Sequence, residues 1–363
     1  MRNRRDFLRN VAGATAGVFV GGRSLADAAL GAVQAPVRRR AMLGGRRITV
    51  IDIHAHHFVP EVIDLVRGTP LEAEFKGQAG NKDRYLGPHW LQYMDREGID
   101  IMALNMNPWW YAADRDLARR ICDLQNQKTA EWVAKYPDRF VGMTTVALQY
   151  PDLAAQQLEE GVKKMGMRGA PIGGSVEGQE LSDRKFDPFW AKAQELDVVL
   201  FMHPQQAPGT TANKRLEGKG ALGNTIGNPL ETTVFLSHLI FEGTLDRFPG
   251  LKICAAHAGG YLPSYLGRSD ARCGRGGGQG DCTKLKPSEY FRRNLYIDTM
   301  IFHESGLRHL VDEVGVDHMV YGTDWPFDWP VGIDFILNAS FLTNAQKEAI
   351  LGGNLIKMLR IKA

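Results

Sequence analysis

Short runs of hydrophobic residues alternate along this chain with longer segments in which hydrophobic residues recur every three or four positions. The runs are uniformly apolar, which is typical of strands buried on both faces of a sheet. Eight runs are predicted as strands: 48–53, 101–106, 140–147, 167–172, 198–202, 251–256, 295–298 and 319–322. The segments between them predict amphipathic helices, among them 114–136, 151–165, 188–196, 230–248 and 304–314.

Strands that alternate with helices eight times predict a (β/α)₈ TIM barrel formed by residues 48–363. An open, doubly wound α/β sheet is the alternative, but no G-x-G-x-x-G follows the first strand. Two connections, 57–85 and 204–229, are longer than the others. Both leave the carboxyl ends of strands, where barrel enzymes place their active sites, so they are candidate walls of a substrate pocket.

The first 28 residues are typical of an export signal. Arg4 and Arg5 stand side by side before the weakly apolar stretch 11–22, and Ala26-Asp27-Ala28 supplies a small-residue cleavage site. This arrangement resembles a twin-arginine signal, which predicts a periplasmic protein. A basic tail without that role is the alternative. The apolar stretch is too short to span a bilayer, where about 20 residues are needed.

The charge of the chain bears on whether it binds nucleic acid or membranes. Lys and Arg total 44 and Asp and Glu total 41, and five of the arginines lie in the leader. A further basic run, within a predicted linker at 29–47, is read as a solvated tether, so no nucleic-acid or membrane partner is expected after processing.

The four cysteines include no C-x-x-C pair. Cys273 and Cys282 flank a glycine-rich loop, and an oxidising compartment would allow them to form a disulfide.

Candidate chemistry begins at the end of the first predicted strand, which reads I-D-I-H-A-H-H. Side chains two positions apart on a strand point the same way, so His54 and His56 are expected to project together into the top of the barrel. Two neutral imidazoles this close form half of a zinc-type site. A packed, hydrogen-bonded histidine pair is the alternative.

Other predicted strands end in residues of the same kind. His203 follows the fifth strand in F-M-H-P, His257 follows the sixth in A-A-H-A-G-G, and Asp324 follows the eighth in Y-G-T-D-W-P. In a barrel all of these carboxyl ends meet on one face. The sequence therefore predicts a metal-dependent active site.

The motifs also resemble those of a known family. N-P-L-E-T-T (228–233), F-P-G-L-K-I-C-A-A-H-A-G-G (248–260), G-R-S-D (267–270), Y-I-D-T (296–299) and V-G-V-D-H-M-V-Y-G-T-D-W-P-F (314–327) lie in order along the chain, followed by G-G-N-L (352–355). Together they resemble the amidohydrolase superfamily. Within it, the branch they resemble is the decarboxylase branch typified by α-amino-β-carboxymuconate-ε-semialdehyde decarboxylase.

The resemblance implies roles for these residues. His54, His56, His203 and Asp324 would hold one divalent metal, expected to be zinc, and His257 and Asp324 would be the acid and base groups. Arg268 would pair with the carboxylate of a small-molecule substrate and reach into the neighbouring subunit, which implies a homodimer. The fourth strand lacks the lysine that bridges two metals in other members of the superfamily, which favours one metal.

Two reactions fit these expectations. The first is non-oxidative decarboxylation of an aromatic or unsaturated carboxylic acid. The alternative is hydrolysis of a lactone, ester or amide, because nearly identical metal sites serve both. A second carboxylate-binding arginine is either Arg67 or Arg84. The residues expected to line an aromatic pocket are Trp109, Trp110, Tyr111, Trp325, Phe327 and Trp329.

Overall fold

The computed structural model describes residues 38–205, 207–274, 283–330 and 332–362, and Arg38–Ala363 is one structural unit. The expected export signal at 1–28, the first half of the expected linker and Cys282 of the expected disulfide lie outside the described residues. Cys122 and Cys254 are buried free thiols. No helix among the described residues is long and apolar enough to cross a membrane.

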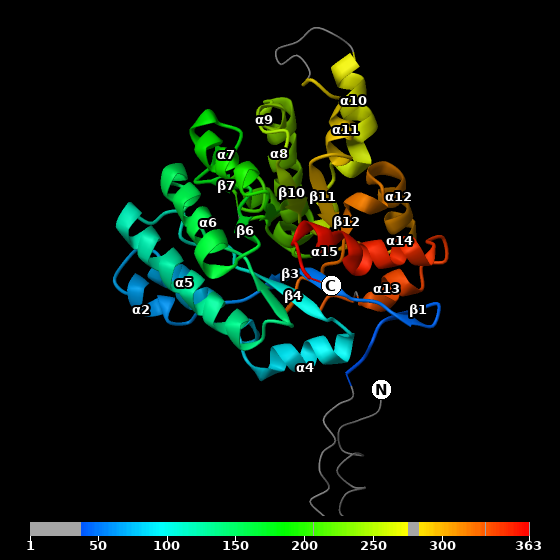
Figure 1. The fold of residues 1–363 in the computed structure, drawn as a ribbon. Coiled ribbons are helices and arrows are strands. Elements are labelled where there is room, and N and C mark those ends of the chain that lie inside the picture. The colour runs from blue at the N-terminus through cyan, green and yellow to red at the C-terminus, as the bar shows by residue number, and fades with distance from the viewer. Residues whose placement is uncertain (1–37, 206, 275–282, 331, 363) are drawn as a thin grey trace, which may run out of the picture. The chain divides into compact units, whose positions relative to one another are not determined.

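Eight parallel strands form the predicted barrel (Figure 1). They are β3 (Ile51–His56), β4 (Ile101–Asn105), β5 (Phe140–Gly142), β6 (Gly169–Ile172), β9 (Val199–Met202), β10 (Lys252–Ala255), β11 (Leu295–Asp298) and β12 (Met319–Val320). They pair in the orders β3-β4-β5 and β12-β11-β10-β9-β6.

Backbone hydrogen bonds close the two gaps between these sheets. At one gap Thr144 N donates to Gly169 O at 2.7 Å, and at the other His56 N donates to Trp325 O at 2.8 Å. The strands therefore form a closed barrel, and the open-sheet alternative is wrong. Strand β5 ends earlier than predicted because the backbone N–H of Thr145 donates to the Asn126 side chain (2.8 Å) and not to a neighbouring strand.

Helices follow the strands around the outside of the barrel (Figure 1). The main ones are α4 (Pro88–Glu97), α5 (Arg115–Lys135), α6 (Pro151–Met165), α7 (Asp187–Glu195), α8 (Asn228–Phe241), α11 (Pro287–Phe291), α12 (Glu304–Val314) and α15 (Asn354–Met358). The single helix predicted over 230–248 is wrong: α8 stops before Gly243, whose φ of +72° is left-handed, and α9 (Thr244–Arg247) follows.

Shorter elements complete the described chain. The long connection after β3 contains α2 (Val62–Val66), α3 (Glu72–Gln78) and the 3₁₀ turn Lys82–Arg84, and the connection after β9 contains the turns Lys214–Leu216 and Gly223–Gly227. The remaining helices are α10 (Leu266–Gly274), α13 (Ile333–Leu337) and α14 (Asn344–Glu348). Two hairpins pair β1 (Met42–Leu43) with β2 (Arg46–Arg47) and β7 (Ser175–Val176) with β8 (Gln179–Glu180).

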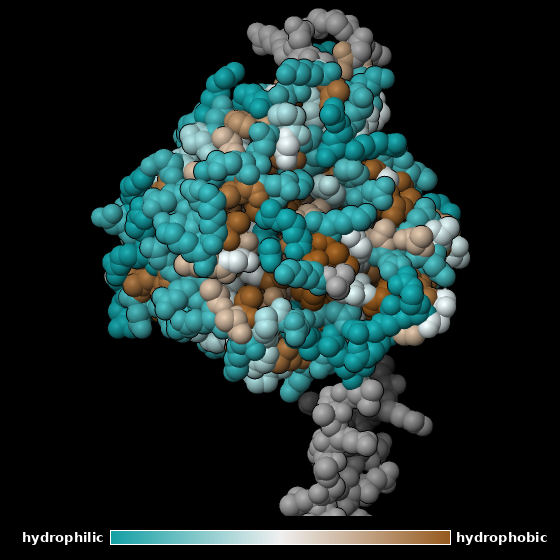
Figure 2. Space-filling model, viewed as in Figure 1, coloured by the Kyte–Doolittle hydropathy of each residue, from teal (hydrophilic) through white to brown (hydrophobic). Residues whose placement is uncertain are grey.

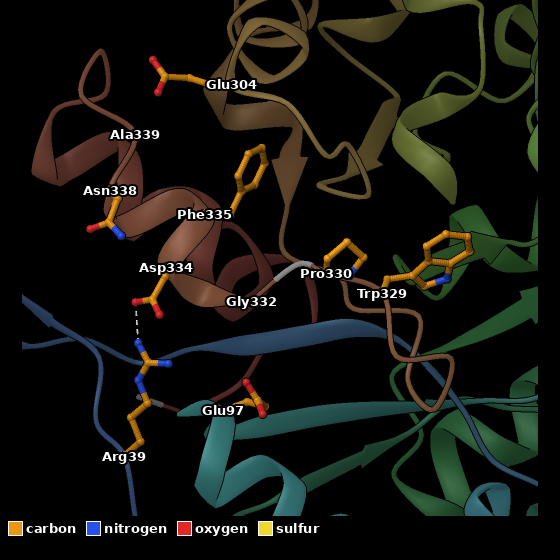
Figure 3. Close-up of a pocket in the computed structure, with 10 residues that line it drawn as sticks. All are labelled: Arg39, Glu97, Glu304, Trp329, Pro330, Gly332, Asp334, Phe335, Asn338 and Ala339. Atoms are coloured by element: carbon orange, nitrogen blue, oxygen red, sulfur yellow. Dashed lines mark hydrogen bonds and ion pairs between the residues drawn. The ribbon is translucent and has the colours of Figure 1, made fainter. Parts of the chain in front are cut away.

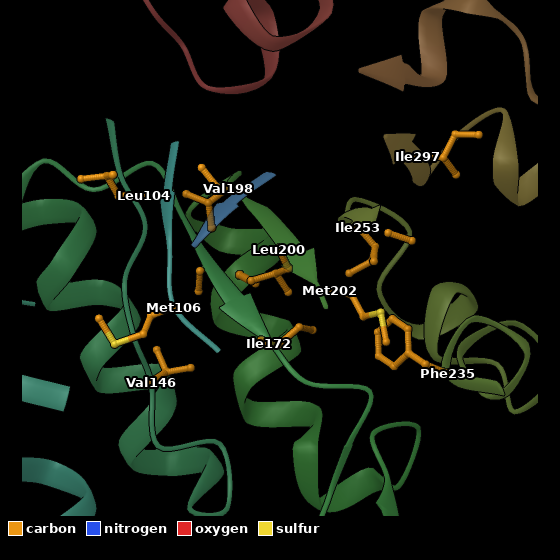
Figure 4. Close-up of a cluster of buried hydrophobic side chains, with 14 of the residues drawn as sticks. Leu104, Met106, Val146, Ile172, Val198, Leu200, Met202, Phe235, Ile253 and Ile297 are labelled. Atoms are coloured by element: carbon orange, nitrogen blue, oxygen red, sulfur yellow. The ribbon is translucent and has the colours of Figure 1, made fainter. Parts of the chain in front are cut away.

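The core has two layers, one on each side of the barrel wall. The outer layer packs strand residues against the helices, and Figure 4 shows Leu200, Met202 and Phe235 among its members. The inner layer fills the barrel and includes Ile51, Ile53 and Phe201. Burying these side chains stabilises the fold by roughly 1.5–3 kcal/mol each.

A bulge in β3 sets the direction of the histidines. The pairing register of β3 with β4 shifts between Asp52 and Ala55. Ile51 and Ile53 therefore fill the barrel interior, Ala55 packs in the outer layer, and His54 still turns inward beside Phe201, with ring centroids 5.0 Å apart. The bulge therefore places His54 and His56 directly above the apolar side chains that fill the barrel.

Part of the predicted linker is attached to the barrel. Arg38 and Arg47 both bind Asp100, at 2.5 and 2.7 Å, and Arg39 binds Asp334 at 2.5 Å. These residues are therefore not a solvated tether. On the face viewed in Figure 2, polar residues cover most of the surface and hydrophobic residues are visible in the gaps between them.

Candidate metal centre and active site

Four predicted ligands converge at the carboxyl ends of the barrel strands. One ligand atom from each of His54, His56, His203 and Asp324 lies within 4.8 Å of the others. The Nε2 atoms of His54 and His56 are 3.0 Å apart, and Asp324 Oδ1 lies 3.1 and 3.0 Å from them. All four residues are buried. The spatial cluster expected from the strand ends is therefore present.

Hydrogen bonds at the other ring nitrogens fix which nitrogen of each histidine faces the cluster. Nδ1 of His54 donates to Asp298 Oδ2 at 2.6 Å, and Nδ1 of His203 donates to the Pro204 carbonyl at 2.9 Å. Because Nδ1 donates a hydrogen bond in both rings, Nε2 is the atom that faces the centre of the cluster. His54 and His203 are thus oriented to bind a cation through Nε2, in exchange for any proton that this atom carries.

Asp298 helps to hold His54 and the neighbouring backbone in place, although no role was assigned to it from the sequence. Its carboxylate also accepts the backbone N–H groups of His257 (3.1 Å), Ala258 (2.8 Å) and Met300 (3.1 Å). It therefore ties strand β11 to His54 on β3 and to the turn after β10. The signal was present in the Y-I-D-T motif, where the aspartate ends the seventh strand.

The electrostatics of the cluster favour positive charge. Burial works against the imidazolium form of His54, but Asp324 and Asp298 outweigh it and raise the pKa of His54 to about 10. Burial also works against the ionised form of Asp324, yet the surrounding histidines hold its pKa well below the usual range. Burial and the neighbouring His54 lower the pKa of His56 to about 4, which keeps that ring neutral.

A divalent metal fits this donor set. Three imidazoles and one carboxylate are ligands that zinc and manganese both accept, and three of the donor atoms lie nearly equidistant around one point. His56 Nδ1 and Asp324 Oδ1 are buried without hydrogen-bond partners in the described structure. For Asp324 Oδ1 a cation at that point would supply the missing contact.

His257 stands beside the cluster. Its Nε2 lies 3.8 Å from Asp324 Oδ2, and its side chain is 15% exposed, more than any of the four ligands. Its φ of +56° and that of Asp324, +58°, are left-handed values that non-glycine residues rarely adopt. Strained backbone of this kind is typical of functional sites. His257 is therefore placed to exchange protons with a substrate.

A cavity of about 590 Å³ opens over the cluster, and His203, His257 and Asp324 form its floor. Arg84 lines its wall, with the guanidinium carbon 5.4 Å from the Trp109 ring and 4.9 Å from the Phe327 ring. The residue is only 7% exposed, and its Nε has no hydrogen-bond partner among the described residues. A buried, incompletely paired guanidinium in a cavity is suited to an anionic ligand.

The structure decides between the two candidate second arginines. Arg84 lines the cavity, whereas Arg67 is exposed and bound to Asp64 at 2.5 Å. Arg268 is exposed on α10 and is not among the residues that line the cavity of its own chain in the described structure.

The expected aromatic pocket forms in part. Trp109, Phe327 and Trp329 line the cavity. Trp110 instead donates its indole N–H to the Val146 carbonyl, and Trp325 stacks on Tyr93 with centroids 3.6 Å apart. In the sequence these two residues look like the other aromatic residues. Their spacing alone therefore did not show which aromatic side chains line the cavity and which pack inside the protein.

Known proteins resemble this chain over most of its length. Residues 51–361 match the amidohydrolase family. A 2-amino-3-carboxymuconate-6-semialdehyde decarboxylase of Dictyostelium discoideum is 29% identical over 278 residues, 74% of this chain and 75% of that protein. A gamma-resorcylate decarboxylase of Polaromonas sp. is 32% identical over 289 residues, 75% of this chain and 86% of that protein.

A solved structure agrees with the fold. The dihydroxybenzoic acid decarboxylase of Polaromonas sp. JS666, with bound manganese and the inhibitor 2-nitroresorcinol, has a TM-score of 0.75 and 28% identity, over 87% of this chain and 98% of that one. The part of the chain that matches the family covers the whole barrel and every candidate ligand. The chain therefore belongs to the amidohydrolase family, in the branch that contains these decarboxylases.

Proposed function

We propose that this protein is a metal-dependent carboxy-lyase that removes the carboxyl group of an aromatic or unsaturated carboxylic acid without oxidation. The observation that carries the proposal is Arg84, a buried guanidinium in the same cavity as the metal cluster. A cation and a guanidinium on one cavity favour a substrate with an anionic group beside further oxygen atoms. The decarboxylase relatives support the same reaction.

Different residues would bind the substrate, orient it and supply the proton in such a reaction. When bound, the metal would hold substrate oxygens beside the carboxylate and stabilise negative charge there. Arg84 orients the substrate anion, while Trp109 and Phe327 contact the apolar face of the molecule. Loss of CO₂ leaves an electron pair on carbon, and that carbon must receive one proton. His257 Nε2 and Asp324 Oδ2 face this space, so the proton would pass to the carbon from His257 beside the Asp324 carboxylate, or through that carboxylate after it accepts the proton.

The reaction class is tested by offering two groups of substrates to the purified protein. We expect CO₂ release from hydroxybenzoates or unsaturated dicarboxylates, measured against a matched panel of lactones, esters and amides. An Arg84→Lys variant keeps the positive charge but loses the planar guanidinium that can donate two parallel hydrogen bonds to a carboxylate. Its KM is therefore expected to rise by at least about tenfold. Turnover confined to the lactones, esters or amides would instead establish the hydrolase reaction.

Manganese is the metal we favour over the zinc expected from the sequence. The support is a structural relative, 28% identical, that contains manganese. Three imidazoles and one carboxylate would hold either ion, so the donor set is compatible with this choice. Elemental analysis of purified protein tests this, and one equivalent of zinc with no manganese would contradict it.

A homodimer would bring Arg268 to a site that it does not reach in its own chain. The support is the exposed position of Arg268 on α10, next to Tyr265, which is 59% exposed. Mixing inactive Arg268→Ala and His54→Ala proteins then restores one complete site in each mixed dimer, about a quarter of full activity after random exchange. No recovery from a mixture shown to have exchanged subunits would contradict the proposal.

Export to the periplasm remains a proposal that rests on the twin-arginine pattern at Arg4 and Arg5. Fractionation of cells should place the processed protein in the periplasm, and an Arg4→Lys, Arg5→Lys variant should stay in the cytoplasm. Processed protein found in the cytoplasm alone would contradict export.

A further inference from the structure

The two carboxylate oxygens of Asp324 have different surroundings. Oδ1 faces the Nε2 atoms of His54 and His56, at 3.1 and 3.0 Å. Oδ2 accepts a hydrogen bond from the indole N–H of Trp329 at 2.8 Å and lies 3.8 Å from Nε2 of His257. One oxygen thus belongs to the metal cluster and the other to the edge of the cavity.

Trp329 reaches this oxygen because the loop after β12 folds back on itself. The backbone N–H of Phe327 donates to the Asp324 carbonyl at 3.0 Å, and both Asp324 and Asp328 have left-handed φ values, +58° and +46°. The turn returns Trp329, five residues along, to the carboxylate at which the loop begins. The contact is therefore a product of the local chain path.

The indole ring is also held by its face. It stacks on Phe302, with centroids 5.3 Å apart and planes at 27°. Trp329 lines the catalytic cavity and also a second cavity of about 610 Å³. Figure 3 shows Trp329 and Pro330 at one side of that second cavity and the Arg39–Asp334 ion pair at another. The ring therefore borders both cavities and packs against Phe302, while its N–H makes a separate polar contact with Asp324.

We infer that Trp329 is a positioning residue, which fixes Asp324 so that one oxygen ligates and the other stays beside His257. A carboxylate is symmetric, and rotation about its Cβ–Cγ bond would let either oxygen, or both, turn toward a cation. An indole N–H can donate but cannot accept or relay a proton, so it holds Oδ2 in place without competing for the proton that moves. The effect on the reaction rests on the proposed function, whereas the effect on metal binding does not.

Packing alone is the competing explanation, and the chain offers variants that separate the two. Trp329→Phe keeps an aromatic ring against Phe302 but removes the N–H donor. Phe302→Leu removes the stacked ring but keeps the donor, and Phe302 is not among the residues lining the catalytic cavity. Both side chains are at least partly exposed, so neither change removes a fully buried group.

The experiment measures manganese affinity by chelator competition, together with kcat, KM and the thermal midpoint of each metal-loaded protein. We expect Trp329→Phe to weaken metal affinity and lower kcat by about tenfold or more each, with KM nearly unchanged, because outer contacts to a ligand are worth about 10–100-fold. Phe302→Leu should change both quantities by less than about threefold.

Two results would overturn the inference. One is wild-type metal affinity and kcat in Trp329→Phe. The other is an equal loss in Phe302→Leu, which would assign the effect to packing. If the wild-type protein releases no CO₂, the proposed function fails, but the metal affinities of the two variants still decide the role of Trp329.

Discussion

Alanine in place of His54 is expected to remove the metal ion and at least about 1,000-fold of kcat/KM, several kcal/mol of transition-state stabilisation. Nε2 of His54 lies 3.0 Å from Nε2 of His56 and 3.1 Å from Asp324 Oδ1, so its loss opens one side of the cluster. The change also leaves Asp298 buried without the histidine that donates to it at 2.6 Å. Elemental analysis and kcat/KM for CO₂ release measure both effects.

His57→Gln is the matched control, because His57 lies three positions away and is equally buried. Its ring nitrogens contact the Asn105 carbonyl and Thr129 Oγ1, both at 2.9 Å, on the side of helix α5 and not at the cluster. Metal content should stay at one equivalent, with the free energy of unfolding lowered by about 1–3 kcal/mol. A His54→Ala protein that keeps full metal and activity would disprove the assigned cluster.

Asp298→Asn is expected to weaken metal affinity by about 10–100-fold, although Asp298 is not among the four ligands. The carboxylate accepts four N–H groups, including Nδ1 of His54 and the backbone N–H of His257. An asparagine amide would turn an N–H₂ group toward one of these donors, so a buried donor loses its partner and His54 loses its fixed tautomer. Chelator competition on the folded variant measures the change.

The control for this change is Asp100→Asn, the same substitution at the residue directly before β4. Asp100 is also largely buried and accepts from Val50 N and the guanidinium groups of Arg38 and Arg47. It should lower stability without changing metal affinity. Equal metal affinity in Asp298→Asn and the wild type would mean that Asp298 only supports the fold.

The barrel and the ligand cluster were predictable because both depend on local patterns. Uniformly apolar runs mark strands covered on both faces, and residues that directly follow such strands meet at one end of a barrel. His203, His257 and Asp324 were found in this way even though they lie far apart in the chain. That His54 and His56 point the same way follows from the two-residue period of a strand, whereas their inward direction depends on the bulge in β3.

Residues that act through other side chains were not predictable in the same way. Asp298 ends a strand as the ligands do, but its hydrogen bond to His54, 244 positions away, is visible only in the closed barrel. Arg67 and Arg84 occupy the same long connection, and which of them enters the cavity depends on the packing of α3 and the turn at Lys82–Arg84. In the sequence Trp329 is one of several candidate pocket aromatics. Only the folded loop shows that its N–H donates to Asp324.

The most direct test of the central claim, that this cluster supports metal-dependent decarboxylation, is release of labelled CO₂ from a carboxyl-¹³C hydroxybenzoate. One preparation is assayed as purified, after chelation, and after addition of one equivalent of Mn²⁺. The account predicts release by the purified protein, loss of release after chelation and recovery on adding the metal. Undiminished release by the metal-free protein, or release from no carboxylic acid while esters or lactones are hydrolysed, would contradict it.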